Sequence, residues 1–149
     1  MALAENRKAR FDYEILDEFE AGIELLGGEV KSAREGRMNL TGAYAIIRGG
    51  EIYLVGADIP LYQPKNALEG YDPQRTRRLL LHKKEIERLA QNVEERGLTL
   101  VPLKVYDKSG KVKILLGLSR RKKKQDKREK IKKEEVKKEM KRILKRIRE

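Results

Sequence analysis

LTLVPLKVYDKSGKVKILLGL, residues 98–118, consists of two apolar runs on either side of the polar turn DKSG, residues 107–110. Two such runs around a turn predict a pair of antiparallel strands. A second pair is predicted upstream, where residues 43–48 and 51–57 flank a Gly-Gly dipeptide, because glycines between apolar runs are a hairpin signal. The centre of the chain is therefore expected to be antiparallel β-structure.

Further strands are expected nearer the N-terminus. Phe11, Tyr13 and Ile15 alternate with polar residues, as in a half-buried strand, and the apolar piece AGIELL follows at residues 21–26. In all, about six strands are predicted, without the strand–helix alternation that builds parallel sheets. A small antiparallel barrel is the expected fold, because closing the sheet removes its exposed edges.

Two helices should accompany the barrel, so the fold class is mainly β with some α. A short helix is predicted over residues 29–36, which end in a glycine. A longer helix is predicted within residues 79–97, where Ile86, Leu89 and Val93 recur at spacings of three and four.

The net charge of +12 is concentrated at the C-terminus. Residues 120–149 hold 17 Lys and Arg against 6 Asp and Glu, a net charge of +11, and residues 1–119 hold 19 against 18. The chain thus divides into a near-neutral body, 1–119, and a cationic tail, 120–149. Such a tail releases counterions when it meets a polyanion, so nucleic acid is the first partner to consider.

The tail also encodes a helix. It contains Glu-to-Lys pairs four residues apart, at 129/133 and 134/138, in the favourable order. One narrow face of that helix is apolar, formed by Val136, Met140, Ile143, Leu144 and Ile147. Because an isolated helix is marginal in water, we expect the tail to be disordered alone and helical when bound.

Composition excludes several kinds of site. The chain has no cysteine and one histidine, His82, which excludes disulfides, thiolate metal sites and multi-histidine metal sites. No apolar run approaches the roughly 18 residues of a membrane span, and the N-terminus lacks an apolar signal core. A soluble, cytoplasmic protein without a cofactor is expected.

Five separate stretches resemble SmpB, the family of SsrA-binding proteins of bacterial ribosome rescue. Each alone is a weak signal, but they occur in the family's order and spacing over nearly the whole chain. The stretches are NRKAR at 6–10, EAGIELLGGEVKSAREG at 20–36, DPQRTRRLLLHKKEI at 72–86, RGLTLVPLKVY with KVKILLGL at 96–118, and KKKQDKRE at 122–129.

The resemblance implies an OB-fold barrel, in agreement with the strand pattern. It also implies a non-enzymatic adaptor that binds the tRNA-like domain of tmRNA and delivers alanyl-tmRNA, with EF-Tu, to stalled ribosomes. The tail would then enter the empty mRNA channel near the decoding region of the small subunit. A helix from Asp126 to Glu149 would span about 36 Å at about 1.5 Å per residue. The protein is expected to be a monomer.

The resemblance further implies two groups of site residues. The first group would contact tmRNA. Within this group the Glu20 carboxylate can accept hydrogen bonds from base amino groups or a 2′-OH, and the His82 ring can stack on a base. The second would contact the ribosome. The first group is Asn6, Arg7, Lys8, Glu20, Glu29, Lys31, Arg34, Arg75, Arg77, Leu80 and His82, and the second is Lys122, Lys123, Lys124, Asp126, Lys127, Arg128 and Ile143.

The chain departs from the family pattern at four positions: Gly28, where the family has Thr or a bulky residue, Ala33, where it has Leu or Ile, Arg121, where it has Gly, and Gln125, where it has His or Tyr. Arg121 makes the junction of body and tail less free to bend than glycine would. Gln125 cannot stack on a base as an aromatic residue would.

Each group also has an ordinary structural interpretation. The basic start can be a frayed terminus, the charges at 29–34 can be solvated helix charges, and arginines at 75–78 can pair with local acids. Leu80 can be a core residue, and a lone histidine is most often structural. The tail can serve solubility, or it can be an amphipathic membrane helix, although its apolar face is narrow and lacks Trp and Phe.

The sequence features bear on three classes of function. The first is the trans-translation adaptor, and the second is a general OB-fold RNA chaperone or ribosome-associated factor. They differ in whether one folded RNA is preferred over bulk tRNA. The third, an enzyme acting on RNA, lacks a recognisable nucleophile–base pair or metal constellation in the sequence.

Overall fold

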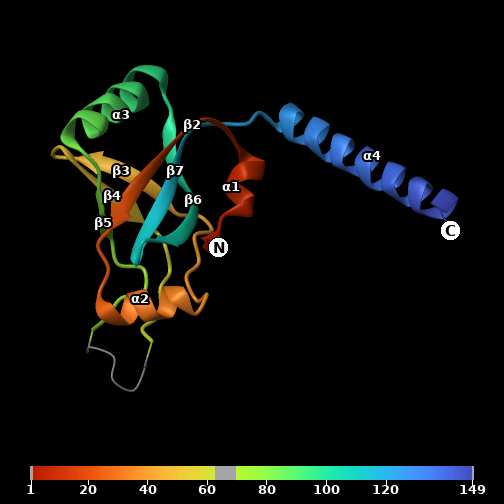
Figure 1. The fold of residues 1–149 in the computed structure, drawn as a ribbon. Coiled ribbons are helices and arrows are strands. Elements are labelled where there is room, and N and C mark those ends of the chain that lie inside the picture. Colours follow the sequence, from red (N-terminus) through yellow and green to blue (C-terminus); the bar gives the residue numbers. More distant parts are fainter. Residues whose placement is uncertain (1, 63–69, 149) are drawn as a thin grey trace.

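The structure, a computed structural model, describes residues 2–62 and 70–148. Its elements are β1 (Ala2–Glu5), α1 (Arg7–Asp12), β2 (Tyr13–Ile23), α2 (Gly27–Arg34), β3 (Tyr44–Arg48), β4 (Glu51–Val55), β5 (Arg77–Leu80), α3 (Lys83–Arg96), β6 (Thr99–Lys108), β7 (Lys111–Arg121) and α4 (Lys124–Arg148). Within the described residues the strands form one antiparallel sheet in the order β1-β6-β3-β4-β5-β2-β7, and β6 also pairs with β7. This last pairing closes strands β2 to β7 into a barrel, with β1 added at β6 (Figure 1).

The closed barrel confirms the mainly β fold expected from the sequence. The two predicted hairpins are β6–β7 and β3–β4. The second turns at Gly49 and Gly50, both at positive φ (60° and 78°), the backbone region that glycine adopts at least cost.

The N-terminal strands differ from the sequence prediction. Residues 13–23 form one 11-residue strand, β2, which has a register irregularity between Ile15 and Asp17. Phe11, expected in a strand, lies in the six-residue helix α1. That helix forms because the Asn6 side chain caps it by accepting a hydrogen bond from the Ala9 N–H at 3.1 Å. A helix this short is too brief to show a 3.6-residue period in the sequence.

Both predicted helices of the body are present. The first, α2, begins at Gly27, two residues earlier than expected, because Glu29 accepts a hydrogen bond from the Leu26 N–H at 2.8 Å. Gly28 packs closely there: a Cβ at this position would lie 3.0 Å from Leu61 Cδ2. The second, α3, ends at Gly97 in the left-handed conformation, as predicted.

The barrel interior is filled by apolar side chains from all of its strands. Fully buried examples are Ile52, Leu54, Leu79, Leu100, Ile114 and Leu116. Helix α3 covers one end of the barrel with Ile86 and Leu89. Each such side chain contributes about 1.5–3 kcal/mol of transfer free energy, so the body carries a core of its own.

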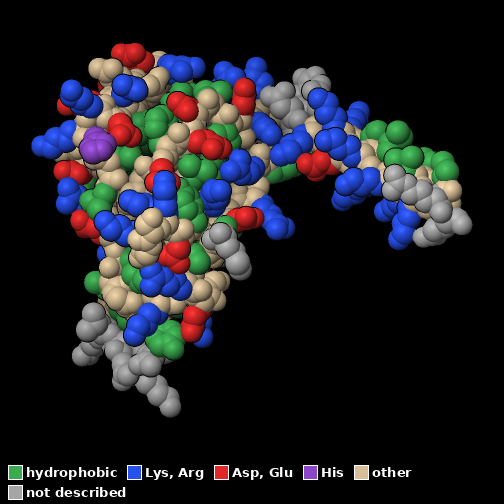
Figure 2. Space-filling view, in the orientation of Figure 1, with side chains coloured by type: hydrophobic (Ala, Val, Ile, Leu, Met, Phe, Trp, Pro, Cys, Tyr) green, Lys and Arg blue, Asp and Glu red, His purple; other side chains and the backbone are tan. Residues whose placement is uncertain are grey.

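Helix α4 projects away from the body (Figure 1), and Lys and Arg side chains cover much of it (Figure 2). Its apolar residues Val136, Met140, Ile143, Leu144 and Ile147 are 44–75% exposed. The strand that precedes it, β7, continues to Arg121, which pairs with Tyr13. Ordered barrel structure thus reaches two residues beyond the boundary expected at 119.

Candidate nucleic-acid interface

Three of the residues expected to contact RNA lie together at the end of β5. A surface hollow of about 410 Å³ is lined by Glu20, Gly22, Leu80, Leu81, His82, Glu85 and Lys113. β2 and β5 pair here, with Gly22 opposite Leu80. A Cβ on Gly22 would lie 3.2 Å from the Leu80 Cβ. The glycine therefore makes room for Leu80 to lie over β2 with 46% of its surface exposed.

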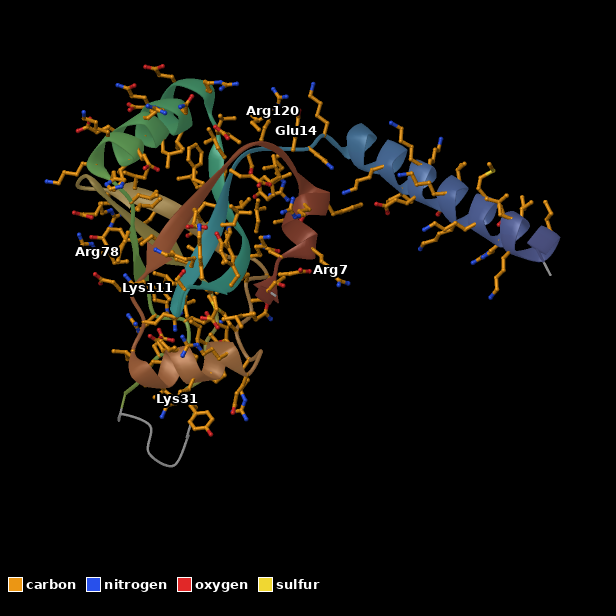
Figure 3. All side chains as sticks on the ribbon, viewed as in Figure 1. Arg7, Glu14, Lys31, Arg78, Lys111 and Arg120 are labelled. Atoms are coloured by element: carbon orange, nitrogen blue, oxygen red, sulfur yellow. The ribbon has the colours of Figure 1, made fainter. Side chains whose placement is uncertain are left out.

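An adjoining hollow of about 330 Å³ extends this site toward α2. It shares Gly22, Leu80 and Lys113 with the first and is also lined by Arg34 and Lys111. Figure 3 shows Lys111 at the end of the barrel beside α2. We call the two hollows together the Leu80 face, defined by Glu20, Arg34, Leu80, His82, Lys111 and Lys113.

The Leu80 face offers chemically different groups side by side. His82 is exposed, and its carbonyl accepts the first backbone hydrogen bonds of α3, from Glu85 at 3.0 Å and Ile86 at 3.1 Å. Arg34 is half exposed and pairs with Asp107 at 3.3 Å. An exposed leucine, an exposed imidazole and cations on one surface can contact a ribose or base, stack on a base and bind phosphate, respectively.

Glu20 is the acid of this face that was expected from the sequence to contact tmRNA. Its carboxylate accepts hydrogen bonds from the Tyr106 hydroxyl and from Lys108 Nζ at 3.1 and 3.3 Å. The Tyr106 hydrogen bond, followed by that from Lys108, lowers the pKa of Glu20 below its usual value. Glu20 is therefore an anion that retains an exposed edge.

Glu29 and Arg77, also expected to contact RNA, are instead buried. Arg77 donates to Glu29 through Nη2 at 2.6 Å and Nε at 3.0 Å, and both side chains have no exposed surface. Arg75 and Tyr71 also donate to this carboxylate. Neither Glu29 nor Arg77 can reach RNA from this position, so the expectation of direct contact is corrected: they join α2 to the first residue of β5.

The ionisation of this buried cluster follows from its hydrogen bonds. Burial alone would raise the pKa of Glu29, but donors from Arg75, the Leu26 backbone, Arg77 and Tyr71 outweigh burial and lower the pKa to about 2. Burial and the neighbouring Glu29 raise the pKa of Tyr71 to about 12. The cluster is a carboxylate with two guanidinium partners, one of which, Arg75, keeps 31% of its side chain exposed.

Asn6 is also buried, at 4% exposure, which corrects its expected role as a contact. Its Nδ2 donates to the carbonyls of Leu40 at 3.2 Å and Pro102 at 2.9 Å, while its Oδ1 caps α1. The hydrogen bonds of the Asn6 side chain are therefore made within the body, where they fix α1 against β6.

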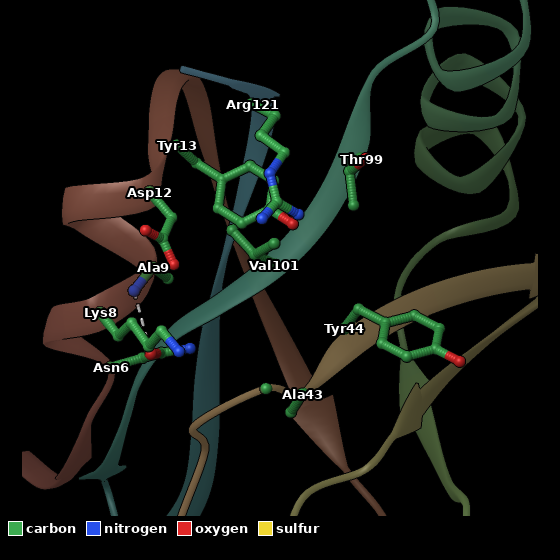
Figure 4. Close-up of a pocket in the computed structure, with 11 residues that line it drawn as sticks. Asn6, Lys8, Ala9, Asp12, Tyr13, Ala43, Tyr44, Thr99, Val101 and Arg121 are labelled. Carbon is green, nitrogen blue, oxygen red and sulfur yellow. Dashed lines mark hydrogen bonds between the residues drawn. The ribbon is translucent and has the colours of Figure 1, made fainter. Parts of the chain in front are cut away.

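Arg7 and Lys8 lie on the α1 side of the barrel rather than on the Leu80 face (Figures 3 and 4). The Arg7 side chain is 92% exposed. Lys8 lines a separate hollow of about 290 Å³ with Asp12, Tyr13 and Arg121, and the Arg121 guanidinium lies 5.9 Å from the centre of the Tyr13 ring. The structure therefore separates the basic N-terminal stretch from Glu20, Leu80 and His82.

Lys31 lies on α2, with its Nζ 5.7 Å from the centre of the Tyr62 ring. Figure 3 shows it on the side of α2 that points away from the barrel. Lys31 is three residues from Arg34, which belongs to the Leu80 face, but Lys31 itself lines neither hollow.

The start of the tail contacts α1. The Lys122 N–H donates to the Asp12 carbonyl at 2.9 Å, and Lys130 Nζ donates to the Arg10 carbonyl at 3.3 Å. Lys123, Arg128 and Ile143 are exposed. The side chains of Lys124, Gln125, Asp126 and Lys127 lie outside the described residues, although their backbone belongs to α4.

The sequence analysis did not identify four residues that line the Leu80 face or donate to Glu20: Tyr106, Lys108, Lys111 and Lys113. The signal was present in KVKILLGL, because alternate residues of a strand share a face and Lys111 and Lys113 are two apart. Recognising that Lys113 lies near Glu20 required the β2–β7 register, in which Gly22 pairs with Lys113.

The described residues lack two other kinds of feature. They contain no group of three or more His, Cys, Asp or Glu side chains that could hold a metal ion. Among their helices, including the 25-residue α4, none is both long and apolar enough to cross a membrane.

Comparison with known proteins gives one consistent result. A family model described as "SmpB protein" matches residues 3–146. The SsrA-binding protein of Gloeothece citriformis is 51% identical over 144 residues, covering 97% of this chain and 93% of the relative. That of Thermosynechococcus vestitus is 51% identical over 143 residues, covering 96% and 94%.

A solved structure described as "tmRNA-SmpB: a journey to the center of the bacterial ribosome" contains a similar chain. The TM-score is 0.66 at 53% sequence identity, and the match covers 80% of this chain and 84% of that one.

Proposed function

This chain belongs to the SmpB family, and from that premise we propose that it is an RNA-binding adaptor of trans-translation. The body binds the tRNA-like domain of tmRNA, and the chain accompanies alanyl-tmRNA and EF-Tu to stalled ribosomes. The relatives are named SsrA-binding proteins, and the similar solved chain belongs to a tmRNA-SmpB complex of the ribosome; both support this assignment. The protein acts as a cytoplasmic monomer, needs no cofactor and is not an enzyme.

The observation that carries the proposal is the Leu80 face. It presents an exposed leucine and imidazole beside two carboxylates, Glu20 and Glu85, and several cations. Phosphate contacts alone would favour any RNA, whereas apolar, stacking and acceptor groups at fixed positions select a particular folded surface. Of the residues expected to contact tmRNA, Glu20, Arg34, Leu80 and His82 are those that line this face.

The tail serves a second contact. The Lys- and Arg-rich helix α4, 25 residues long, is about 37 Å in length at about 1.5 Å per residue, and it enters the empty mRNA channel near the decoding region. Its exposed apolar residues have no core to join in the body, so the helix is marginal alone and gains its support from the ribosome. Lys122 to Lys124 and Asp126 to Arg128 lie where this segment leaves the barrel.

The charge of the tail also favours a second candidate, a general OB-fold RNA chaperone or ribosome-associated RNA-binding protein. A net charge of +11 on 30 residues binds any polyanion with strong salt dependence. Such a protein would not discriminate the tRNA-like domain from bulk tRNA.

A purified translation system stalled on an mRNA without a stop codon tests the proposal. The full chain should support peptide tagging, and Leu80→Ala should reduce both tmRNA affinity and tagging. Lys127→Ala combined with Arg128→Ala should leave tmRNA affinity nearly unchanged and block tagging. Full tagging by both variants would favour the general RNA-binding protein.

A further inference from the structure

The local surroundings of Glu20 explain how an anion can serve on a surface that binds RNA. Glu20 projects from β2, and Tyr106 and Lys108 reach it from β6 across the intervening strand β7. Three neighbouring strands of the rigid barrel therefore fix these side chains relative to one another. The Glu20 side chain keeps 35% of its surface exposed.

The hydrogen bonds to Glu20 leave part of its carboxylate free. Its Oε2 accepts from the Tyr106 hydroxyl and from Lys108 Nζ at 3.3 Å, and its Oε1 accepts from Lys108 Nζ at 3.1 Å. A carboxylate has about four acceptor positions, two on each oxygen. The described donors occupy both positions of Oε2 and one of Oε1, which leaves one acceptor position on Oε1.

The charge states of the pair follow from the same contacts. The hydrogen bonds from Tyr106 and Lys108, with the charge of Lys113 on β7, lower the pKa of Glu20, and burial together with Glu20 raises the pKa of Tyr106 to about 12. His82 and Glu85, from the start of α3, line the same hollow. At neutral pH Tyr106 therefore donates and Glu20 accepts.

We propose that Tyr106 and Lys108 are positioning residues, which hold Glu20 so that the free acceptor position of Oε1 receives a hydrogen bond from an N–H or O–H donor of the bound RNA. This rests on the proposed function, because it takes the tRNA-like domain as the ligand of the Leu80 face. Lys108 offsets the charge of Glu20 at the surface, so approaching phosphates meet a neutral pair. Tyr106 fixes the rotamer of the carboxylate.

A purely structural role explains the arrangement less well. Exposed ion pairs contribute little to stability, in the range of about 0–1 kcal/mol. The Tyr106 ring is held by other means, since Lys104 Nζ lies 5.4 Å from its centre. Removing the Tyr106 hydroxyl should therefore leave the fold intact while it frees the Glu20 side chain.

Tyr106→Phe is the sharper probe of the two positioning residues, because it changes no net charge, whereas loss of Lys108 also weakens general attraction to RNA. The affinity of the full-length protein for the tRNA-like domain of tmRNA is measured for Tyr106→Phe, Glu20→Ala and the double variant. Tyr106→Phe should weaken binding about 5-fold, the usual effect of one hydrogen bond, and should have no effect when Glu20 is already Ala. Tyr53→Phe on β4, outside both hollows, is the matched control and should bind normally.

The possible outcomes distinguish the positioning role from the proposed function. An equal loss from Tyr106→Phe in both backgrounds would mean that Tyr106 contacts RNA itself, which overturns its positioning role. Weaker binding by Glu20→Ala with normal binding by Tyr106→Phe would also overturn it and leave the proposed function standing. Unchanged binding by Glu20→Ala would remove Glu20 from the RNA contact altogether.

Two further measurements complete the test. The carboxyl ¹³C shift of Glu20 should titrate at higher pH in Tyr106→Phe than in the parent protein, and an unchanged titration would contradict the positioning role. Interference mapping with 2′-deoxynucleotides identifies the donor: interference that vanishes in Glu20→Ala assigns a ribose hydroxyl, and its absence assigns a base amino group.

Discussion

Replacing Arg77 with methionine should destabilise the body far more than replacing its neighbour Arg78. Arg77 has no exposed surface and donates to Glu29 at 2.6 and 3.0 Å, to the Ala57 carbonyl at 2.7 Å and to the Pro73 carbonyl at 2.9 Å. Arg77→Met leaves both carbonyls without that donor and leaves the buried carboxylate with Arg75 as its remaining guanidinium partner.

Breaking a buried ion pair by removing one partner costs about 3–5 kcal/mol, and Arg75 keeps the expected loss near the lower end, about 3 kcal/mol. Domains of this size are stable by about 5–15 kcal/mol, so the loss is a large fraction of the total. Arg78 lies on the other face of β5, 44% exposed, and pairs with Glu51 at 3.0 Å; Arg78→Met should cost about 1 kcal/mol or less.

Urea unfolding followed by circular dichroism gives the free energy of unfolding of both variants. A difference of less than about 1 kcal/mol between Arg77→Met and Arg78→Met would refute the idea that the Glu29 cluster holds α2 to the strand β5.

Three other results are expected. The pKa of Glu29 is lowered to about 2 from an ordinary 4.5, so the ionised Glu29 contributes to the free energy of unfolding above about pH 4.5. This contribution, about 3 kcal/mol, should be lost as the pH falls from about 4.5 toward 2. Glu29→Gln should flatten this part of the pH–stability curve. A chain ending at Lys123 should fold, because the described side chains of α4 add nothing to the barrel core, and in filter binding it should lose part of its salt-dependent affinity while still preferring the tRNA-like domain to bulk tRNA. Ile143→Pro should leave tmRNA affinity intact and block tagging, because proline inside a helix costs about 3 kcal/mol or more. Ile143→Ala preserves the helix and measures the loss of the side chain alone, and normal tagging by Ile143→Pro would show that the helix is not needed.

The hairpins and α3 could be predicted because their signals are local. Turn residues between apolar runs fix β3–β4 and β6–β7, and the spacing of Ile86 and Leu89 followed by Gly97 fixes α3. By contrast, β1 is only four residues long and α1 six, and segments this short carry too few residues to show a period.

Only part of the candidate site could be predicted, and the reason is again that the missing signals are not local. The resemblance to the family pointed to Glu20, Leu80 and His82 as candidates, but neither it nor residue type could tell exposed charges from buried ones. Glu29 and Arg34 sit in one short helix, yet Glu29 points to a buried cluster and Arg34 to the surface. Glu29 pairs with Arg77, 48 positions away, and Arg34 pairs with Asp107, 73 positions away. Such pairings form only when the barrel closes, so the sequence does not show which charge is buried.

The affinity of Glu20→Ala for the tRNA-like domain of tmRNA tests most directly whether the Leu80 face recognises this RNA, because two physical explanations predict opposite signs. If the body bound RNA by charge alone, removing an anion would tighten binding. Recognition through a hydrogen bond to the Glu20 carboxylate instead predicts weaker binding, by about 5-fold or more, and a smaller preference over bulk tRNA, with an unchanged circular dichroism spectrum. Equal or tighter binding by a correctly folded Glu20→Ala would contradict recognition of this RNA by the Leu80 face.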